Sequence, residues 1–182
     1  MQDPEAELAE VYLQPGEMFL AREPTIIRTL LGSCVGVTFR SERLGIGALC
    51  HAMLPRCPDG HPLGLRPEVG YRYVDYCIRN LARKFDELGA HRSEVHVKVF
   101  GGADVLLDET ETLVRPTIGS LNCDSALDVL GAEGFQVMAS SLRGKSGLNI
   151  QFNTGNGEIR LRKLKHTSGY PRRRGHVERP DA

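Results

Sequence analysis

The sequence lacks any apolar run that approaches the roughly 18 residues needed to span a membrane as a helix. It also lacks net charge, because 23 Lys and Arg residues balance 23 Asp and Glu residues. The first absence argues against a membrane-inserted protein. The second leaves nothing in the overall charge to favour a polyanion such as DNA as the main partner. The proportions of hydrophobic (41%) and charged (25%) residues are instead typical of a folded globular protein.

The cysteines form no C-x-x-C pair, and their number, five, is odd. The N-terminus begins acidic and lacks the basic and apolar regions of a signal peptide. We therefore expect a cytoplasmic protein whose thiols stay reduced. Each cysteine is then either a small buried hydrophobe or a reactive group. The positions are Cys34, Cys50, Cys57, Cys77 and Cys123.

A chain of 182 residues predicts one domain, which we place at 8–165. The segment 1–7 is polar and acidic, and 166–182 is rich in Arg, Gly and Pro without apolar periodicity, so we expect both ends to be flexible. The basic cluster at 172–174 is typical of a solvated tail. The Pro- and Gly-containing segment 58–67 predicts a long surface loop of the kind that often borders a site.

Apolar residues alternate with period two in several segments, which predicts strands with one buried face. The clearest of these segments are 35–39, 44–50 and 95–100. Near the C-terminus, the alternating segments 148–152 and 159–161 flank the turn residues 155–157 and predict a β-hairpin.

Two segments predict helices. Apolar residues recur every four positions along 71–89 as one stripe, and Gly89 suits a left-handed helix end. A shorter helix is expected to start near Asn122, as a capping residue followed by Asp124, and to stop by Gly131 or Gly134. Because strands outnumber helices and no internal repeat is evident, the sequence predicts a single-domain α+β fold.

Cys34 stands among small residues at the entry to an apolar strand. Gly32 and Gly36 allow a tight turn or the close approach of another backbone. A substrate chain could then reach the sulfur, and amide N–H groups could point at a developing oxyanion. On these residues alone, a buried structural thiol is a commoner role for a cytosolic cysteine than catalysis.

His51 is the first candidate partner for Cys34. If 34–39 and 44–50 form a hairpin, the start of the first strand lies opposite the end of the second, and the two side chains come together. A free thiol has a pKa of about 8.5, so an adjacent imidazole would increase the thiolate fraction and later return the proton to a leaving amine. Five other histidines are present, however, and a lone histidine is usually structural or exposed.

Two rival sites have weaker support. The candidate ligands of a zinc site are Cys50, His51, Cys57 and His61. Thiolate and imidazole suit zinc, but Cys50 and His51 are neighbours on a predicted strand and should point to opposite faces. The glycine-containing run 101–104 is a candidate phosphate-binding loop, yet it matches neither G-x-G-x-x-G nor a P-loop, and a tight turn explains it equally well.

At these residues the sequence resembles the CheD family, the chemoreceptor glutamine deamidases of bacterial and archaeal chemotaxis. The matching motifs occur in the family's order and span most of the chain, and the spacing from Cys34 to His51 also resembles that of the family. The motifs are LLGSCVGV at 30–37, HAMLP at 51–55, KVFGGA at 98–103, Ile118-Gly119 with Asn122, and Thr154-Gly155 with Gly157-Glu158.

The resemblance implies a β-sandwich-like sheet core flanked by helices, similar in catalytic arrangement to the cytotoxic necrotizing factor deamidases. It implies hydrolysis of receptor glutamines to glutamates through a thioester on Cys34, with His51 as base and then acid. It leaves open whether receptor methyl esters are also hydrolysed. The implied partners are chemoreceptor cytoplasmic domains and a CheC-type phosphatase, without metal, organic cofactor, nucleic acid or membrane insertion.

One position departs from the family pattern. The family often has a threonine six positions before the cysteine, thought to complete a triad, whereas here Arg28 stands there and Thr29 follows. In an extended segment, a shift of one residue turns a side chain to the opposite face, although a bulge near Gly32 could restore its aim. We take Thr29 as the third candidate catalytic residue, with Ser33 or a backbone carbonyl as alternatives. If Arg28 pointed at the sulfur, it would favour the thiolate.

The altered position keeps a second function open. A module that docks on receptors or on a CheC-type phosphatase, with little catalysis, would tolerate the weakened triad that Arg28 implies. The segment 142–147 also resembles a glycine-rich loop of the family, with Arg143 where another glycine is expected, and this difference bears on receptor affinity or substrate choice.

Overall fold

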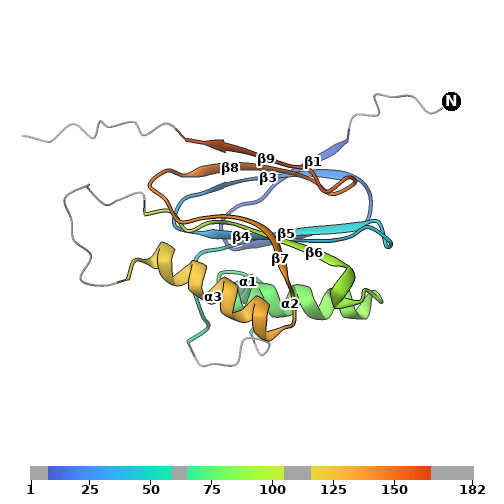
Figure 1. Ribbon diagram of the computed structural model, residues 1–182, viewed down its shortest axis with the longest axis horizontal. Helices are drawn as coiled ribbons and strands as arrows, with labels where there is room; N and C mark the ends of the chain where they lie inside the picture. The colour runs from blue at the N-terminus through green and yellow to red at the C-terminus, as the bar shows by residue number, and fades with distance from the viewer. Residues whose placement is uncertain (1–7, 59–64, 105–115, 165–182) are drawn as a thin grey trace, which may run out of the picture.

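Two β-sheets and a layer of helices are stacked in the computed structural model, which describes residues 8–58, 65–104 and 116–164 (Figure 1). The predicted flexible ends, 1–7 and 166–182, lie outside the described residues, as does most of the predicted loop at 58–67. The α+β class and the sheet core flanked by helices are confirmed. No helix in the described ranges is long and apolar enough to cross a membrane.

The sheet at the top of Figure 1, here called the outer sheet, has the strand order β1-β3-β8-β9. Its strands are β1 (Ala9–Tyr12), β3 (Thr25–Leu31), β8 (Leu148–Asn153) and β9 (Ile159–Lys163). The sheet in the middle, the central sheet, has the order β2-β5-β4-β6-β7. Its strands are β2 (Glu17–Ala21), β4 (Val35–Ser41), β5 (Ile46–Ala52), β6 (Val95–Gly101) and β7 (Val137–Leu142). β1 pairs with β3 and β7 with β6 in parallel, and the other pairs are antiparallel.

The strands predicted from apolar alternation are confirmed as β4, β5, β6 and the β8–β9 hairpin. β5 begins at Ile46 rather than Leu44, because Gly45 turns the chain with a φ of 63°. The sequence patterns do not predict β1, β2, β3 or β7.

The helices cover the face of the central sheet that points away from the outer sheet (Figure 1). They are α1 (Pro67–Gly70), α2 (Val74–Glu87), the short 3-10 helix η2 (Arg92–Glu94) and α3 (Ile118–Ala132). The predicted amphipathic helix is α2, which begins at Val74 rather than at residue 71. Gly89 follows it in the left-handed conformation, with a φ of 80°, as predicted.

The prediction that a helix starts near Asn122 is wrong. α3 begins at Ile118, because the Thr117 side chain accepts a hydrogen bond from the Ser120 N–H at 3.0 Å and caps the helix. Asn122 is fully buried within α3 and does not cap it. The end is closer to expectation, with Ala132 as the last helical residue and Gly134 left-handed at a φ of 79°.

The main core lies between the central sheet and the helices. Phe39 of β4 is fully buried there against the rings of Phe85 and Phe135, with centroids 5.6 and 5.0 Å away. Two smaller apolar clusters fill the space between the two sheets. One contains Leu13, Ile27, Leu49 and Phe152, and the other contains Leu31, Phe100, Leu148 and Ile150.

The alternation along β5 divides its side chains between these layers. Cys50 belongs to the core under the helices, whereas its neighbour Leu49 packs between the sheets. Side chains on a strand alternate between faces, so His51 shares the face of Leu49 and points toward the outer sheet. A buried imidazole therefore lies between the two sheets, near the end of the sandwich where β5 finishes.

Candidate active site

Cys34 lies where the chain crosses from one sheet to the other. β3 of the outer sheet ends at Leu31 and β4 of the central sheet begins at Val35, so residues 32–34 form the crossing, here called the nucleophile loop. Of the five cysteines, Cys34 alone is partly exposed, and the other four are buried. It is thus the thiol that a substrate can reach.

The β4–β5 register brings Cys34 toward His51. Gly36 lies directly opposite His51, and Val35 lies opposite Ala52. Opposite residues of an antiparallel pair share a face, so Gly36 and His51 both face the outer sheet. Cys34 precedes β4 in the nucleophile loop and packs against the apolar cluster of Leu31, Phe100, Leu148 and Ile150 between the sheets. A side chain on Gly36 would meet the side chains of Leu31 and Leu49. The predicted β4–β5 hairpin is confirmed, and the pairing of Cys34 with His51 stays a prediction.

Thr29 of β3 reaches across from the outer sheet to His51. Its Oγ1 lies 2.7 Å from His51 Nδ1 and 2.9 Å from the Leu13 carbonyl oxygen, and the Thr29 side chain is buried. A carbonyl oxygen can only accept, so the single hydroxyl proton of Thr29 is donated to Leu13. Thr29 Oγ1 must then accept from His51, which places the imidazole proton on Nδ1.

This tautomer leaves His51 Nε2 as an acceptor. Nε2 is buried and has no hydrogen-bond partner among the described residues. The arrangement therefore offers an unprotonated ring nitrogen between the sheets, with its ring held by Thr29, at the end of the sandwich that carries Cys34.

Burial keeps both groups neutral. It lowers the pKa of His51 from the ordinary 6.5 to about 4, although a hydrogen bond with the Leu13 backbone and the negative charge of Glu17 act in the opposite direction. Burial also raises the pKa of the Cys34 thiol, and a hydrogen bond from its own backbone N–H opposes that shift. At neutral pH the pair is a thiol and a neutral imidazole rather than an ion pair.

The condition under which Arg28 would favour the thiolate is not met, because Arg28 does not point at the sulfur. Its side chain is 43% exposed and forms an ion pair with Glu10 at 2.5 Å on the outward face of the outer sheet. Consecutive residues of a strand face opposite ways, so an outward Arg28 requires an inward Thr29. No bulge is needed to aim Thr29 at His51.

Backbone and side-chain donors hold all three carbonyl groups of the nucleophile loop. The Gly102 N–H donates to the Cys34 carbonyl at 2.8 Å, and the Ala103 N–H donates to the Gly32 carbonyl at 2.9 Å. Between them, Asn122 Nδ2 donates to the Ser33 carbonyl at 2.9 Å. The loop is thus fixed from behind by the end of β6 and by α3.

The glycine run at the end of β6 is close-packed behind Cys34. Gly101 and Gly102 adopt φ values of 102° and 66°, which favour glycine. A Cβ on Gly101 would collide with the Cys34 carbonyl oxygen. A Cβ on Gly102 would collide with Cys123 Sγ and lie 2.8 Å from the Gly119 carbonyl oxygen. These glycines allow α3 and β6 to approach the nucleophile loop.

Arg143 also occupies a backbone position that usually needs glycine, with a φ of 66°. Its side chain binds α3, with Nη2 2.7 Å from Asp124 Oδ1 and Nη1 3.3 Å from Ser120 Oγ, and its N–H donates to the Gly101 carbonyl at 2.8 Å. The arginine therefore ties the turn between β7 and β8 to the helix beside Cys34.

The zinc interpretation does not fit the two residues at its centre. Cys50 lies in the core under the helices and His51 lies between the sheets, on opposite faces of β5 as predicted. The Cys57 N–H is bound by Asp75 Oδ1 at 3.1 Å. His61 lies outside the described residues.

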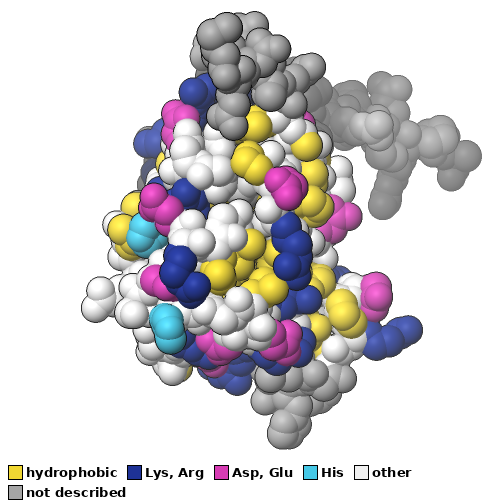
Figure 2. All heavy atoms as spheres, turned by 90° about the vertical axis from the view of Figure 1, so that its right-hand side faces the viewer, with side chains coloured by type: hydrophobic (Ala, Val, Ile, Leu, Met, Phe, Trp, Pro, Cys, Tyr) yellow, Lys and Arg dark blue, Asp and Glu magenta, His cyan; other side chains and the backbone are white. Residues whose placement is uncertain are grey.

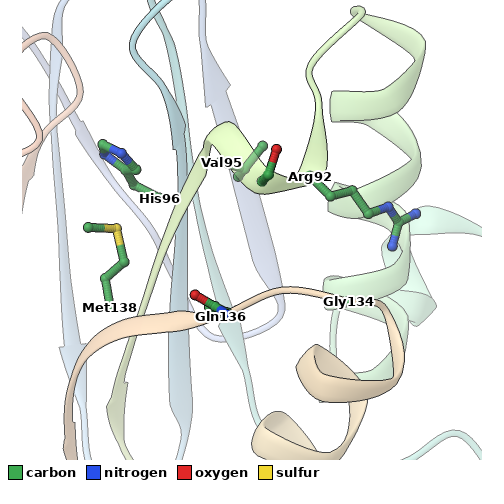
Figure 3. A pocket seen from close by; sticks show the side chains of 7 residues that line it. Arg92, Val95, His96, Gly134, Gln136 and Met138 are labelled. Atoms are coloured by element: carbon green, nitrogen blue, oxygen red, sulfur yellow. The ribbon is translucent and has the colours of Figure 1, made fainter.

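One surface hollow lies at the far end of the sandwich. A hollow of about 370 Å³, whose lining includes Arg92, His96 and Met138, sits where β6 begins (Figure 3). The end of β6 that approaches Cys34 is Gly101, so this hollow is remote from the thiol. Figure 2 looks onto this far end, where basic and acidic side chains are interspersed. Their ion pairs include Arg43–Glu94, at 2.8 Å.

Comparison with known proteins agrees with the motifs. A family model described as "CheD chemotactic sensory transduction" matches residues 53–163. The "Probable chemoreceptor glutamine deamidase CheD 2" of Geobacter sulfurreducens is 41% identical over 160 residues, which cover 88% of this chain and 93% of the relative. A match of that length in a chain of 182 residues necessarily includes positions 34 and 51.

Two further relatives carry the name "Probable chemoreceptor glutamine deamidase CheD". The protein from Maridesulfovibrio salexigens is 33% identical, with 88% of this chain and 95% of the relative covered. The protein from Oleidesulfovibrio alaskensis is 35% identical, with 92% of this chain and 78% of the relative covered.

Proposed function

This chain belongs to the CheD family, and from that membership we propose that it hydrolyses selected glutamine side chains of chemoreceptors to glutamates, with Cys34, His51 and Thr29 as its catalytic residues. The observation that carries the mechanism is the hydrogen bond between Thr29 and His51, which leaves Nε2 as an acceptor without a partner in the described part of the chain. Cys34 packs against the apolar cluster between the same two sheets. The receptor substrate is proposed from the names of the relatives.

The first half of the reaction forms a thioester. His51 Nε2 takes the thiol proton while Cys34 Sγ forms a bond to the amide carbon, and the carbonyl π electrons move to oxygen. When the oxyanion collapses, the carbon–nitrogen bond breaks, and the nitrogen takes the proton from Nε2 and leaves as ammonia. Thr29 holds the imidazolium in place during these transfers by accepting from Nδ1–H.

The second half returns the enzyme to its starting state. A water oxygen attacks the thioester carbon as His51 Nε2 takes one water proton. Collapse of this second intermediate breaks the carbon–sulfur bond, and the proton on Nε2 passes to Cys34 Sγ. Glutamine and water have become glutamate and ammonia, and every proton transfer uses groups of this chain or of the substrate.

We place the reaction in the cytoplasm, where the receptor signalling domains are the protein substrates. A CheC-type phosphatase is a further proposed partner, and that proposal rests on the family resemblance alone.

The proposal predicts loss of activity in Cys34→Ala without loss of fold. Incubation of the wild type with a receptor cytoplasmic fragment should raise the mass of specific glutamine-containing peptides by about one dalton. Cys34→Ala should leave those peptides unchanged, because it removes the nucleophile. Peptide mass spectrometry measures the first effect and thermal unfolding checks the second. Full activity in Cys34→Ala would refute the mechanism.

The same variant separates the enzyme from the binding module. Cys34→Ala should still bind the receptor fragment in a pull-down, because only the sulfur atom is lost. If cells that carry Cys34→Ala also showed normal chemotaxis, a role in binding without catalysis would be supported. Normal binding with lost chemotaxis would support the enzyme.

A further inference from the structure

We propose that Asn122 positions the backbone N–H of Cys34 as the hydrogen-bond donor to the oxyanion of the tetrahedral intermediate. The inference rests on the proposed acyl-transfer chemistry of Cys34. It assigns the oxyanion donor to the nucleophile's own peptide group and makes a buried residue of α3 responsible for the direction of that group.

The orientation of the Asn122 amide is fixed by what surrounds it. Nδ2 donates to the Ser33 carbonyl at 2.9 Å and to the Met53 carbonyl at 3.0 Å. A flipped amide would place Oδ1 against both carbonyl oxygens, so only the observed orientation is favourable. One side chain thus joins the peptide before Cys34 to the segment that follows His51.

The contact between Asn122 and the Ser33 carbonyl also fixes the direction of the Cys34 N–H. The Ser33 carbonyl and the Cys34 N–H belong to the same planar trans peptide, in which the two groups point in opposite directions. Because Nδ2 holds the Ser33 carbonyl toward α3, the Cys34 N–H points away from the helix.

The Cys34 N–H lies beside the reacting sulfur, because both groups belong to the same residue. A hydrogen bond from this N–H to the sulfur of the same residue lowers the pKa of the Cys34 thiol, against the larger effect of burial. A donor directed at Sγ is close to any carbonyl oxygen that is attached to the carbon under attack. In a site with little water, such a donor stabilises developing negative charge strongly.

The peptide group cannot easily turn away. The carbonyl groups of Gly32 and Cys34, on either side of it, are held by the backbone N–H groups of Ala103 and Gly102. Rotation of the central peptide would break the Asn122 contact and strain both neighbours. The donor is therefore oriented before substrate binds.

The unpaired half of Asn122 gives a second, independent indication of function. Asn122 is fully buried, and its Oδ1 has no hydrogen-bond partner among the described residues. An unpaired buried acceptor lowers stability, because its hydrogen bond to water is lost and not replaced. An aliphatic residue would avoid that cost if the position served packing alone, so the two donors of Nδ2 are the feature that needs an asparagine.

The test compares two reactions of Cys34 in the full chain. Acylation by p-nitrophenyl acetate passes through an oxyanion, whereas alkylation by iodoacetamide displaces iodide at carbon without one. Asn122→Ala should slow acylation at least tenfold more than alkylation, because a misdirected donor affects only the first reaction. In receptor deamidation the same variant should lower kcat with little change in KM. Mass spectrometry confirms modification at Cys34, with Cys34→Ala as the blank.

Ser125→Ala is the matched control. Ser125 is buried on the same helix, and its Oγ donates to the Pro55 carbonyl at 2.5 Å, beyond His51 and away from the nucleophile loop. It should lose thermal stability while the ratio of acylation to alkylation rates stays that of the wild type. If Asn122→Ala does not fold, Asn122→Ser, whose hydroxyl is too short to reach both carbonyls, is measured in the same pair of reactions.

The outcomes separate this inference from the proposed function. Equal slowing of both reactions in the Asn122 variants, or the same ratio change in Ser125→Ala, would overturn the role of Asn122. A wild type that is acylated but leaves receptor glutamines unchanged would refute the proposed substrate and still allow the acylation test to be read. Selective loss of acylation in the Asn122 variants alone supports the inference.

Discussion

Replacement of Thr29 by valine tests the link between the two sheets that holds His51. Valine keeps the shape of threonine but removes the hydroxyl, so His51 Nδ1–H and the Leu13 carbonyl both lose their partner in a buried site. A buried polar group left unpaired costs about 1–3 kcal/mol. The two freed groups can partly satisfy one another, because the Leu13 backbone also lies within hydrogen-bond reach of His51. We therefore expect the unfolding free energy to fall by about 1–3 kcal/mol.

The effect on catalysis should be larger than the effect on binding. Without Thr29 Oγ1 as acceptor, the ring can rotate or carry its proton on Nε2, and that tautomer cannot accept from Cys34. General base catalysis is worth about 10²–10⁴ in rate, so partial loss of alignment should lower kcat by about 10- to 100-fold with little change in KM. Steady-state deamidation kinetics of Thr29→Val and Thr29→Ser measure this, and the serine variant should retain most of the activity.

Arg28→Thr provides the control that could refute this reasoning. It places a threonine at the position where the family pattern has one, but on the outward face beside Glu10. We expect near wild-type kinetics for Arg28→Thr and no rescue when it is added to Thr29→Val. If Thr29→Val kept full kcat, or if Arg28→Thr restored activity to it, the assignment of Thr29 as the residue that orients His51 would be wrong.

Two further predictions follow from burial and packing. Burial lowers the pKa of His51 to about 4 in the folded chain, whereas its ordinary value is 6.5, so unfolded chains bind more protons between these pH values. The stabilising contribution of neutral His51 should be fully present above pH 6.5, and the unfolding free energy should fall by about 3 kcal/mol as the pH drops toward 4. His51→Gln should remove this pH dependence from unfolding free energies measured by chemical denaturation. Gly102→Ala should lower the unfolding free energy by at least about 2 kcal/mol more than Gly134→Ala, because both have positive φ but only the first Cβ meets other atoms; equal losses would contradict the packing argument.

Much of the sheet structure follows from local sequence. The strands that do not follow from it form because they pair with segments far away in the chain. β8 and β9 alternate cleanly about a glycine-rich turn, so their hairpin is predictable. β7 is instead mostly exposed, and its sequence, VMASSL, has no clear alternation. It becomes a strand because it pairs in parallel with β6, from which α3 separates it in the sequence. A short stretch of sequence around β7 therefore cannot predict this pairing.

The third catalytic candidate was ambiguous for a similar reason, although one signal was present. In β3, whose sequence is TIIRTLL, Thr29 shares its face with Ile27 and Leu31, which are fully buried between the sheets. The charged Arg28 marks the opposite, outward face. The alternation of side chains between the two faces of a strand therefore favours Thr29 over Arg28. This argument requires that residues 25–31 form a strand, and their nearly continuous apolar pattern does not predict one.

At Asn122 a local rule competes with a distant contact. An asparagine followed by an aspartate suits a helix start, but Thr117 already supplies the cap of α3. The Ser33 and Met53 carbonyls that Asn122 binds are far away in sequence. Asn122 and Ser125 are the polar members of the buried face of α3, and a buried polar residue in the middle of a helix indicates a distant partner.

The neutral state of Cys34 and His51 decides what the surrounding structure must supply. In a thiolate–imidazolium pair the thiol is already deprotonated before substrate binds. Burial disfavours both charges here, because it raises the pKa of the Cys34 thiol and lowers that of His51. Charge therefore develops during the attack itself, on the imidazole and on the substrate oxygen. Thr29 faces the first of these charges, and the Cys34 N–H held by Asn122 faces the second. The binding-only alternative rested on the weakened triad that Arg28 implied. Because Thr29 faces inward and contacts His51, Arg28 no longer supports that alternative.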